Sequence, residues 1–182
     1  MAERWPKIVS RRIVDISPWL KIIARDVKFS QSTPVETYHA VGQQDYIAIV
    51  ARTPEGKILI VRQFRPAVEA FTWELPAGLV DQGEQPVECC RRELLEETGY
   101  PARAIHPLGS GDPCTGRLSN RIHSFFVETG EPVAEFQAEP GIDVAAKSTT
   151  ELVALINAGE FVQQLHLGAL LLAELHGLIR LP

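Results

Sequence analysis

Three glutamates near the middle of the chain, Glu93, Glu96 and Glu97, have the type and spacing needed to hold a divalent cation. They stand at positions i, i+3 and i+4, so on a helix all three carboxylates leave the same face, about one turn apart. Like charges at this spacing repel, and a solvated acidic face is the plainer interpretation of such a trio. Oxygen ligands without histidine or thiolate suit Mg²⁺ or Mn²⁺, which usually keep several waters, bridge to substrate phosphates and help to make a water nucleophilic.

The helix that must position these carboxylates has well-marked ends. Pro86 fits its first turn, and Glu84 and Glu88 complement its positive end. Gly99 is placed to end it in a left-handed conformation. Immediately upstream, the segment WELPAG (residues 73–78) predicts a strand that ends in a turn. The carboxylates are therefore expected on a rigid helix that follows this turn.

Short apolar segments elsewhere in the chain predict strands and two final helices. Patches between Lys7 and Phe29, broken by Pro18, favour strands, and residues 30–34 form a turn-rich break. A hairpin is expected at residues 46–50 and 58–61, a strand at 122–127, and two helices within 150–181 with a break near Gly159. This order predicts a mixed α/β fold with an N-terminal β unit over residues 1–40 and the main domain over 41–182.

Composition and charge exclude several classes of protein. The 182 residues carry 18 basic and 23 acidic side chains, so the net charge of -5 offers no general attraction to nucleic acids. No apolar stretch follows the charges of the N-terminal segment, and the most apolar helix is interrupted by Gly168, so neither a signal peptide nor a membrane span is expected. The three cysteines lack the spacing of a zinc site, which favours a reduced cytoplasmic protein. None of the five histidines is expected to bind a metal.

The stretch GLVDQGEQPVECCRRELLEETGY, which begins at Gly78, closely resembles the Nudix box. It matches every fixed position of that motif. Its ending, EETGY with Tyr100 last, resembles the ending found in the ADP-ribose pyrophosphatase branch of the family. The resemblance implies a Nudix-type α/β/α sandwich with a mixed β-sheet and an N-terminal β subdomain. The fixed positions are Gly78, Glu84, Arg92, Glu93, Leu94, Glu96, Glu97 and Gly99.

The resemblance also implies roles for individual residues around a Mg²⁺ ion, or Mn²⁺ in its place. The main chain of Ala77 and the carboxylates of Glu93 and Glu97 would hold the metal, and Glu96 would add a ligand or a proton acceptor. Arg92 would act as a brace, because its planar fork can grip a carboxylate such as Glu84 with two hydrogen bonds.

Segments outside the box indicate the substrate. RQFR (residues 62–65) and ELPAG (residues 74–78) resemble segments of ADP-ribose pyrophosphatases and of their GDP-mannose-cleaving relatives. Arg65 is expected to contact a phosphate, with a solvated strand end as the alternative, and Pro113 would mark ADP-ribose preference. Trp19 and Tyr38 stand where aromatic residues of some relatives stack on adenine, although packing within a core is the commoner role of such residues.

The catalytic base implied by the resemblance is a glutamate on a loop after the strand at 122–127. Glu139 is the leading candidate, followed by Glu135 and Asp143, and Glu96 on the helix is the alternative. Directly after Glu139, Pro140 and Gly141 stand where the family usually has a further acidic residue.

The activity expected from these residues is Mg²⁺-dependent hydrolysis of ADP-ribose to AMP and ribose 5-phosphate. GDP-mannose or another nucleotide sugar remains an alternative, as does a non-catalytic nucleotide-sensing module, although such modules usually lose one of the motif carboxylates. The N-terminal β unit resembles a platform that reaches a partner subunit and helps to build the base pocket, so a homodimer is expected by analogy.

Overall fold

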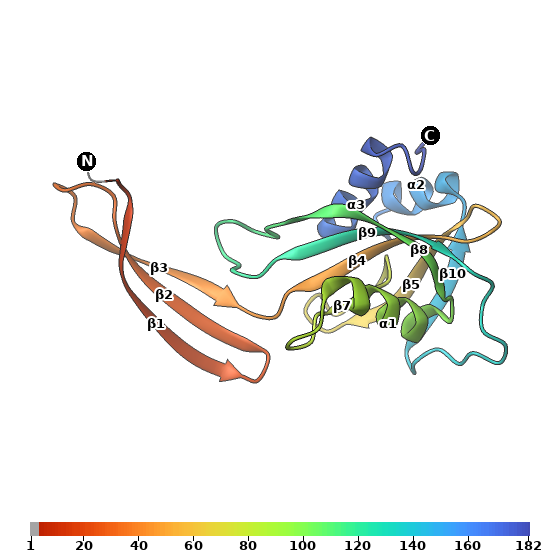
Figure 1. Cartoon of the computed structure of the whole chain (residues 1–182), viewed down its shortest axis with the longest axis horizontal. Helices are drawn as coiled ribbons and strands as arrows, with labels where there is room; N and C mark the ends of the chain where they lie inside the picture. Colours follow the sequence, from red (N-terminus) through yellow and green to blue (C-terminus); the bar gives the residue numbers. More distant parts are fainter. Residues whose placement is uncertain (1–3) are drawn as a thin grey trace. The chain divides into compact units, whose positions relative to one another are not determined.

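The computed structural model describes residues 4–182, and within it the chain forms two compact units (Figure 1). The first unit comprises Met1–Gln44 and Asp112–Arg121, and the second comprises Asp45–Gly111 and Ile122–Pro182. Residues 1–3 of the predicted N-terminal unit lie outside the described residues. The division follows Gln44 rather than residue 40, because the last strand of the first unit runs to Gly42.

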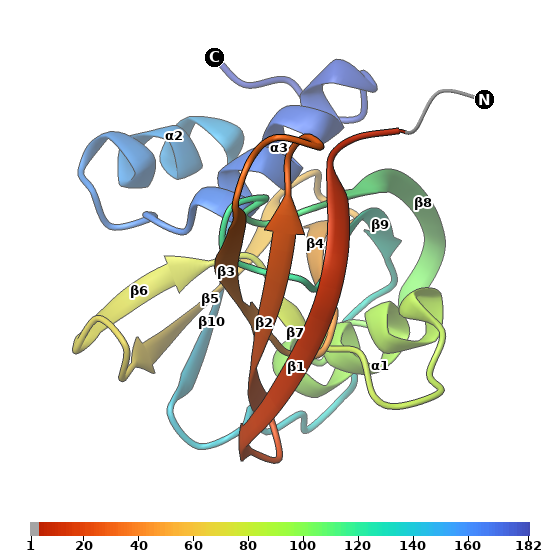
Figure 2. The ribbon, with the colours of Figure 1, turned by 90° about the vertical axis from the view of Figure 1, so that its left-hand side faces the viewer.

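The first unit is a three-stranded antiparallel sheet in the order β1-β2-β3 (Figure 2). Its strands are β1 (Lys7–Ser17), β2 (Leu20–Lys28) and β3 (Val35–Gly42). Segment 112–121 joins this unit through a hydrogen bond of 2.8 Å from the Val41 N–H to the Arg117 carbonyl. Many apolar side chains of the sheet are exposed, which departs from the inward packing that stabilises most sheets.

The second unit is built on a mixed sheet in the order β10-β5-β4-β9-β8, with β6 paired to β5 and β7 paired to β4. Strands β4 and β9 run parallel, and the other pairs are antiparallel. The strands are β4 (Tyr46–Arg52), β5 (Ile58–Arg65), β6 (Ala70–Glu74), β7 (Ala77–Leu79), β8 (Ala102–Gly111), β9 (Ile122–Thr129) and β10 (Ile142–Lys147). The predicted hairpin and the strand at 122–127 are thereby confirmed.

Helices cover both faces of this sheet (Figure 1). Because side chains alternate along a strand, Ile47 and Ile49 of β4 pack towards α1 (Pro86–Thr98), while Ala48 and Val50 pack towards the C-terminal helices. These are α2 (Thr149–Asn157) and α3 (Gln164–Leu175). The predicted α/β sandwich is confirmed.

The ends of α1 follow the predicted signals. Pro86 occupies its first turn, and Gly99 adopts a left-handed conformation with φ of 74° while its N–H donates to the Leu95 carbonyl. Cys89 and Cys90 of α1 are buried against the sheet. Within the described part of the chain, no helix has both the length and the apolar character needed to cross a membrane.

Candidate active site

Helix α1 lies directly against the start of strand β7, and this contact places two carboxylates side by side. The Glu97 carboxylate, only 7% exposed, accepts the Ala77 N–H at 3.0 Å. Glu93 packs so closely over Gly78 that a Cβ atom built there would lie 2.0 Å from the Glu93 Cδ. Because β7 is hydrogen-bonded to β4, with Gly78 opposite Ile47, this part of the backbone is held firmly.

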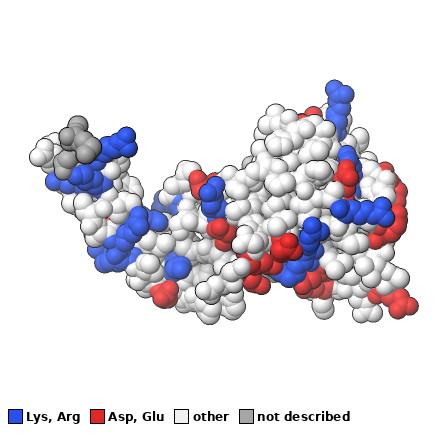
Figure 3. Space-filling model, in the orientation of Figure 1, with Lys and Arg blue, Asp and Glu red and all other residues white. Residues whose placement is uncertain are grey.

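Arg92 binds three carboxylates of the same region at once. Its Nε and Nη2 donate to the two oxygens of Glu84 at 3.0 and 2.9 Å, which is the fork geometry expected from the sequence. Its Nη1 donates to Glu93 at 2.6 Å and to Glu96 at 3.1 Å. The hydrogen bonds from Arg92 lower the pKa of Glu84 to about 2. Acidic and basic side chains accordingly lie side by side over α1 in Figure 3.

Burial raises the pKa of both Glu97 and Glu93. Burial, helped by the charges of Glu93 and Glu139 and opposed by the Ala77 N–H and Arg65, raises the pKa of Glu97 to about 8. Burial likewise raises the pKa of Glu93, with Arg92 opposing the shift. Two carboxylates removed from water in this way gain from a bound cation. The charge of Glu139, on the loop before β10, also acts on Glu97.

Arg65 lies between this acidic pair and a second, buried carboxylate. Its Nε and Nη2 donate to Glu74 at 2.9 and 2.6 Å, and Glu74, only 2% exposed, also accepts the Thr72 hydroxyl at 2.6 Å. The predicted phosphate contact is therefore left to Nη1, which makes no hydrogen bond to the described residues. The charge of Arg65 lowers the pKa of Glu97, which places Arg65 near the acidic pair.

Two residues of this region were not predicted as functional from the sequence. Glu74 was considered only as part of the ELPAG segment, and His166 was assigned no function. His166 on α3 is 4% exposed, and its Nδ1 accepts the Leu75 N–H at 3.1 Å. The available signal was weak, because it consisted of one histidine within a leucine-rich helix.

The residues predicted to bind the base lie in the first unit. Trp19 is 67% exposed and lines a cavity of about 160 Å³ with Pro18 and Gln43. Trp19 lies two residues before Lys21, which pairs with Gly42 at the end of β3. Tyr38 donates a hydrogen bond to Glu36 and lies four residues before Gly42 along the same strand, which is roughly 13 Å. Within one copy, the structure therefore does not bring the Trp19 and Tyr38 rings together. Pro113 lies half-buried in the segment 112–121.

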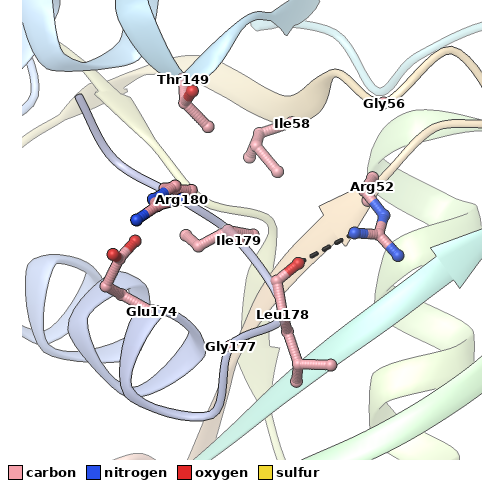
Figure 4. A pocket seen from close by; sticks show the side chains of 9 residues that line it. All are labelled: Arg52, Gly56, Ile58, Thr149, Glu174, Gly177, Leu178, Ile179 and Arg180. Carbon is pink, nitrogen blue, oxygen red and sulfur yellow. Dashed lines mark hydrogen bonds between the residues drawn. The ribbon is translucent and has the colours of Figure 1, made fainter.

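A larger cavity of about 610 Å³ lies elsewhere in the second unit (Figure 4). Ile58 at the start of β5 lines it, whereas Arg65 ends the same strand, roughly 23 Å away at 3.3 Å per residue. The Arg52 side chain also lines this cavity, and its Nη1 donates to the Leu178 carbonyl at 2.9 Å. None of the predicted site residues lines this cavity.

Comparison with known proteins decides the family. The model of the NUDIX domain matches residues 42–161, which is well over half of the chain. The chain belongs to the Nudix family. The matched region contains β4, β7 and α1, and thus the acidic site, but it ends before α3 and His166.

Individual Nudix relatives carry names of nucleotide-sugar pyrophosphatases. An ADP-ribose pyrophosphatase of Bacillus subtilis is 39% identical over 82 residues, which cover 45% of this chain and 44% of that protein. A GDP-mannose pyrophosphatase of Yersinia enterocolitica is 30% identical over 140 residues, which cover 70% of this chain and 71% of that protein. The chain spans about half the length of the first curated relatives that it matches.

A solved structure confirms the Nudix fold. The crystal structure of an ADP compounds hydrolase superposes with a TM-score of 0.81, covering 98% of this chain and 100% of that chain at 19% identity. At this identity the likeness concerns the fold alone.

The donor set of the acidic site fits a hard divalent cation, as the Nudix motif implies. Glu93, Glu97 and the Ala77 main chain offer oxygen atoms only, and burial raises the pKa of both carboxylates. Among the described residues, no three acidic, histidine or cysteine side chains converge into a ready cation site. Main-chain, water and substrate oxygens would therefore have to complete the coordination, which is the usual arrangement for Mg²⁺.

Proposed function

We propose that this Nudix protein is a divalent-metal-dependent pyrophosphohydrolase that cleaves ADP-ribose to AMP and ribose 5-phosphate. The observation that carries the proposal is the pair of Glu97, which is buried, and Glu93, which is half-buried and bound by Arg92; the two pack against Ala77 and Gly78. A purely solvated acidic face would expose these carboxylates, whereas here they are desolvated and next to each other. The intact set of motif glutamates also argues against a nucleotide-sensing module.

The residues of the chain divide the work as follows. A Mg²⁺ ion bound at Glu93 and Glu97 would neutralise the pyrophosphate and make a water more acidic. Arg65 directs Nη1 towards a phosphate while Glu74 fixes the rest of its guanidinium. Glu139 accepts the proton of the attacking water, because Glu96 is already engaged by Arg92.

ADP-ribose is the leading substrate because two observations point to it together. The RQFR and ELPAG segments resemble those of ADP-ribose pyrophosphatases, and several relatives bear that name. The exposed Trp19, at the rim of a cavity of about 160 Å³, offers an aromatic face on which a base can stack. GDP-mannose is the second candidate, because the relative of that name aligns over 70% of this chain.

We further propose that the first unit pairs with a second copy of the chain. Its sheet exposes large apolar side chains that monomeric proteins seldom leave uncovered in such number. On β1, those exposed by between 47% and 60% are Ile8, Val9, Ile13, Val14 and Ile16. A homodimer would cover them, and the resemblance to the ADP-ribose pyrophosphatase branch supports this arrangement.

The test is hydrolysis of a substrate panel with Mg²⁺ at about 5 mM, above ordinary KM values. The panel contains ADP-ribose, GDP-mannose, UDP-glucose, NADH, coenzyme A and a dinucleoside polyphosphate, and chromatography identifies the products. We expect preferential release of AMP from ADP-ribose. Preferential cleavage of another member would still support the metal site but would contradict ADP-ribose as the substrate. If no member is cleaved, the proposed enzymatic activity is wrong.

A variant pair locates the activity in the acidic site. Glu97→Gln should lower kcat on the order of 1,000-fold because it removes a charged ligand, while the thermal unfolding transition stays cooperative. Glu88→Gln is the matched control, since Glu88 lies on the same helix with its side chain 61% exposed, outside the pair. Near-normal turnover of Glu97→Gln with Mg²⁺ would contradict the proposed site.

A further inference from the structure

His166 connects the C-terminal helix to the backbone that enters the acidic site. The ring lies on α3, is 4% exposed, and accepts the Leu75 N–H on Nδ1 at 3.1 Å. Because Nδ1 accepts this hydrogen bond, the imidazole is neutral and carries its proton on Nε2. Burial favours the same state, since it lowers the pKa of His166 to about 4.

The backbone that His166 holds is fixed at three successive residues. Residues 75–76 connect β6 to β7, so the strand ladders leave the Leu75 N–H to another partner, and His166 supplies it. The Pro76 carbonyl accepts the Ile49 N–H at 2.9 Å, and the Ala77 N–H donates to Glu97 at 3.0 Å. The Leu75 side chain is fully buried, so water cannot easily replace His166 as the acceptor.

The neighbouring polar groups are already engaged with one another. Glu74 lies 4.0 Å from the His166 Nδ1, but it accepts hydrogen bonds from Arg65 and Thr72. The bond from Arg65 joins β5 to β6 and the bond from Thr72 lies within β6, whereas the bond from His166 reaches the next residue, Leu75. The imidazole therefore acts on the connection that leads into Ala77, not on the Arg65 pair.

We propose that His166 is a positioning residue for the hydrolysis, which holds residues 75–77 so that the Ala77 main chain and the Glu97 carboxylate are presented together to the cation. This inference rests on the proposed function, and it adds α3 to the parts of the chain on which catalysis depends. The match to the Nudix domain ends at residue 161, so this support comes from outside the matched region.

Two substitutions separate positioning from simple packing. His166→Leu keeps an apolar side chain of similar size but removes the acceptor. His166→Asn is smaller but can place its amide oxygen where Nδ1 stands. If the ring served only to fill space, the leucine variant would be the milder of the two. If the acceptor matters, the asparagine variant will be the milder one.

For His166→Leu we expect kcat to fall about tenfold and the Mg²⁺ concentration for half-maximal activity to rise about tenfold, in the range seen for groups that orient metal ligands. KM for the substrate should change less than threefold, and His166→Asn should recover most of kcat. Leu171→Ala, on the exposed side of the same helix with Leu171 55% exposed, should leave all three values unchanged.

Two measurements without turnover complete the test. Amide hydrogen exchange at Leu75 and Ala77, followed by NMR, should accelerate in His166→Leu, and Mn²⁺ binding followed by electron paramagnetic resonance should weaken about tenfold. Unchanged exchange at Ala77 together with unchanged Mn²⁺ affinity would overturn the positioning role, even if the wild-type protein is an active hydrolase. Conversely, a wild-type protein that cleaves no nucleotide would refute the proposed function, while altered exchange and Mn²⁺ binding would still support the positioning of the site. If His166→Leu does not fold, His166→Gln, which displaces the acceptor by one methylene, takes its place with the same expected direction.

Discussion

Gly78→Ala should inactivate the site without removing any of its functional groups. A Cβ at this position would lie 2.0 Å from the Glu93 Cδ and 2.1 Å from its Oε1. Ordinary van der Waals contact begins at 3.4 Å, so the carboxylate must retreat by about 1.4 Å. The backbone cannot take up this displacement easily, because Gly78 is paired to Ile47 in the middle of the sheet. Gly78 does not need a left-handed conformation, so the effect is steric.

The expected magnitude follows from this displacement. A misplacement of about 1 Å in a catalytic group costs roughly 100-fold in rate, or about 2.7 kcal/mol of activation free energy. Glu93 would also lose its 2.6 Å hydrogen bond from Arg92 if it rotated away. We therefore expect kcat for ADP-ribose to fall by about 100-fold to 1,000-fold. The Mg²⁺ concentration for half-maximal activity should rise in the same assay.

The control is another glycine substitution on the same unit. Gly168 lies within α3 with no atom within 4 Å of an added Cβ, so Gly168→Ala should retain full activity and gain about 0.5–1 kcal/mol of stability. Circular dichroism would show that both variants are folded. Wild-type turnover in a folded Gly78→Ala protein would refute the conclusion that Glu93 acts from the place it occupies against β7.

Three further perturbations test other parts of the molecule. Trp19→Ala should raise KM for ADP-ribose about tenfold, because base stacking contributes ~1–3 kcal/mol, and an unchanged KM would make Trp19 structural. Ile13→Glu should shift the mass measured by light scattering from dimer to monomer, and a monomeric wild-type protein would contradict the pairing. His166 in the unfolded chain takes up a proton near pH 6.5, whereas buried His166 binds it only near pH 4. Lowering the pH from 6.5 to 4 should therefore reduce the free energy of unfolding, measured in urea, by about 3 kcal/mol more in the wild-type protein than in His166→Asn. Parallel plots of this free energy against pH for the two proteins would contradict the prediction.

The parts of the fold that the sequence predicts are those with a local signal. Helix α1 is determined by Pro86, by the spacing of its glutamates and by Gly99, all within one short stretch. The central strands β4 and β5 are apolar on both faces and were found for that reason. Strands β8 and β10 lie at the two ends of the sheet order and were missed. An edge strand needs fewer apolar residues, and β8 also contains Pro107 and an irregular register near Gly109.

The residues of the candidate site also divide into those with a local sequence signal and those without one. The carboxylates of α1 could be found because helical periodicity places them on one face, and the Arg92 clamp was implied by the resemblance of this stretch to the Nudix box. His166 could not, because its partner Leu75 is 91 residues away in the chain, and only the packing of α3 brings them together. The same holds for Arg65, since a strand-end arginine does not reveal that a buried glutamate already occupies most of its donors.

Charge balance explains why the acidic pair remains available for a cation. Both arginines of the region bind carboxylates outside that pair with two hydrogen bonds each, Arg92 to Glu84 and Arg65 to Glu74, and Arg92 shares its remaining Nη1 between Glu93 and Glu96. Each arginine therefore has most of its charge compensated before it can neutralise Glu93 or Glu97. Burial raises the pKa of both glutamates, and the two arginines oppose that shift only in part. A protein of net charge -5 that is to act on a polyanion needs a local positive charge, and this distribution leaves the role to a metal ion rather than to a side chain.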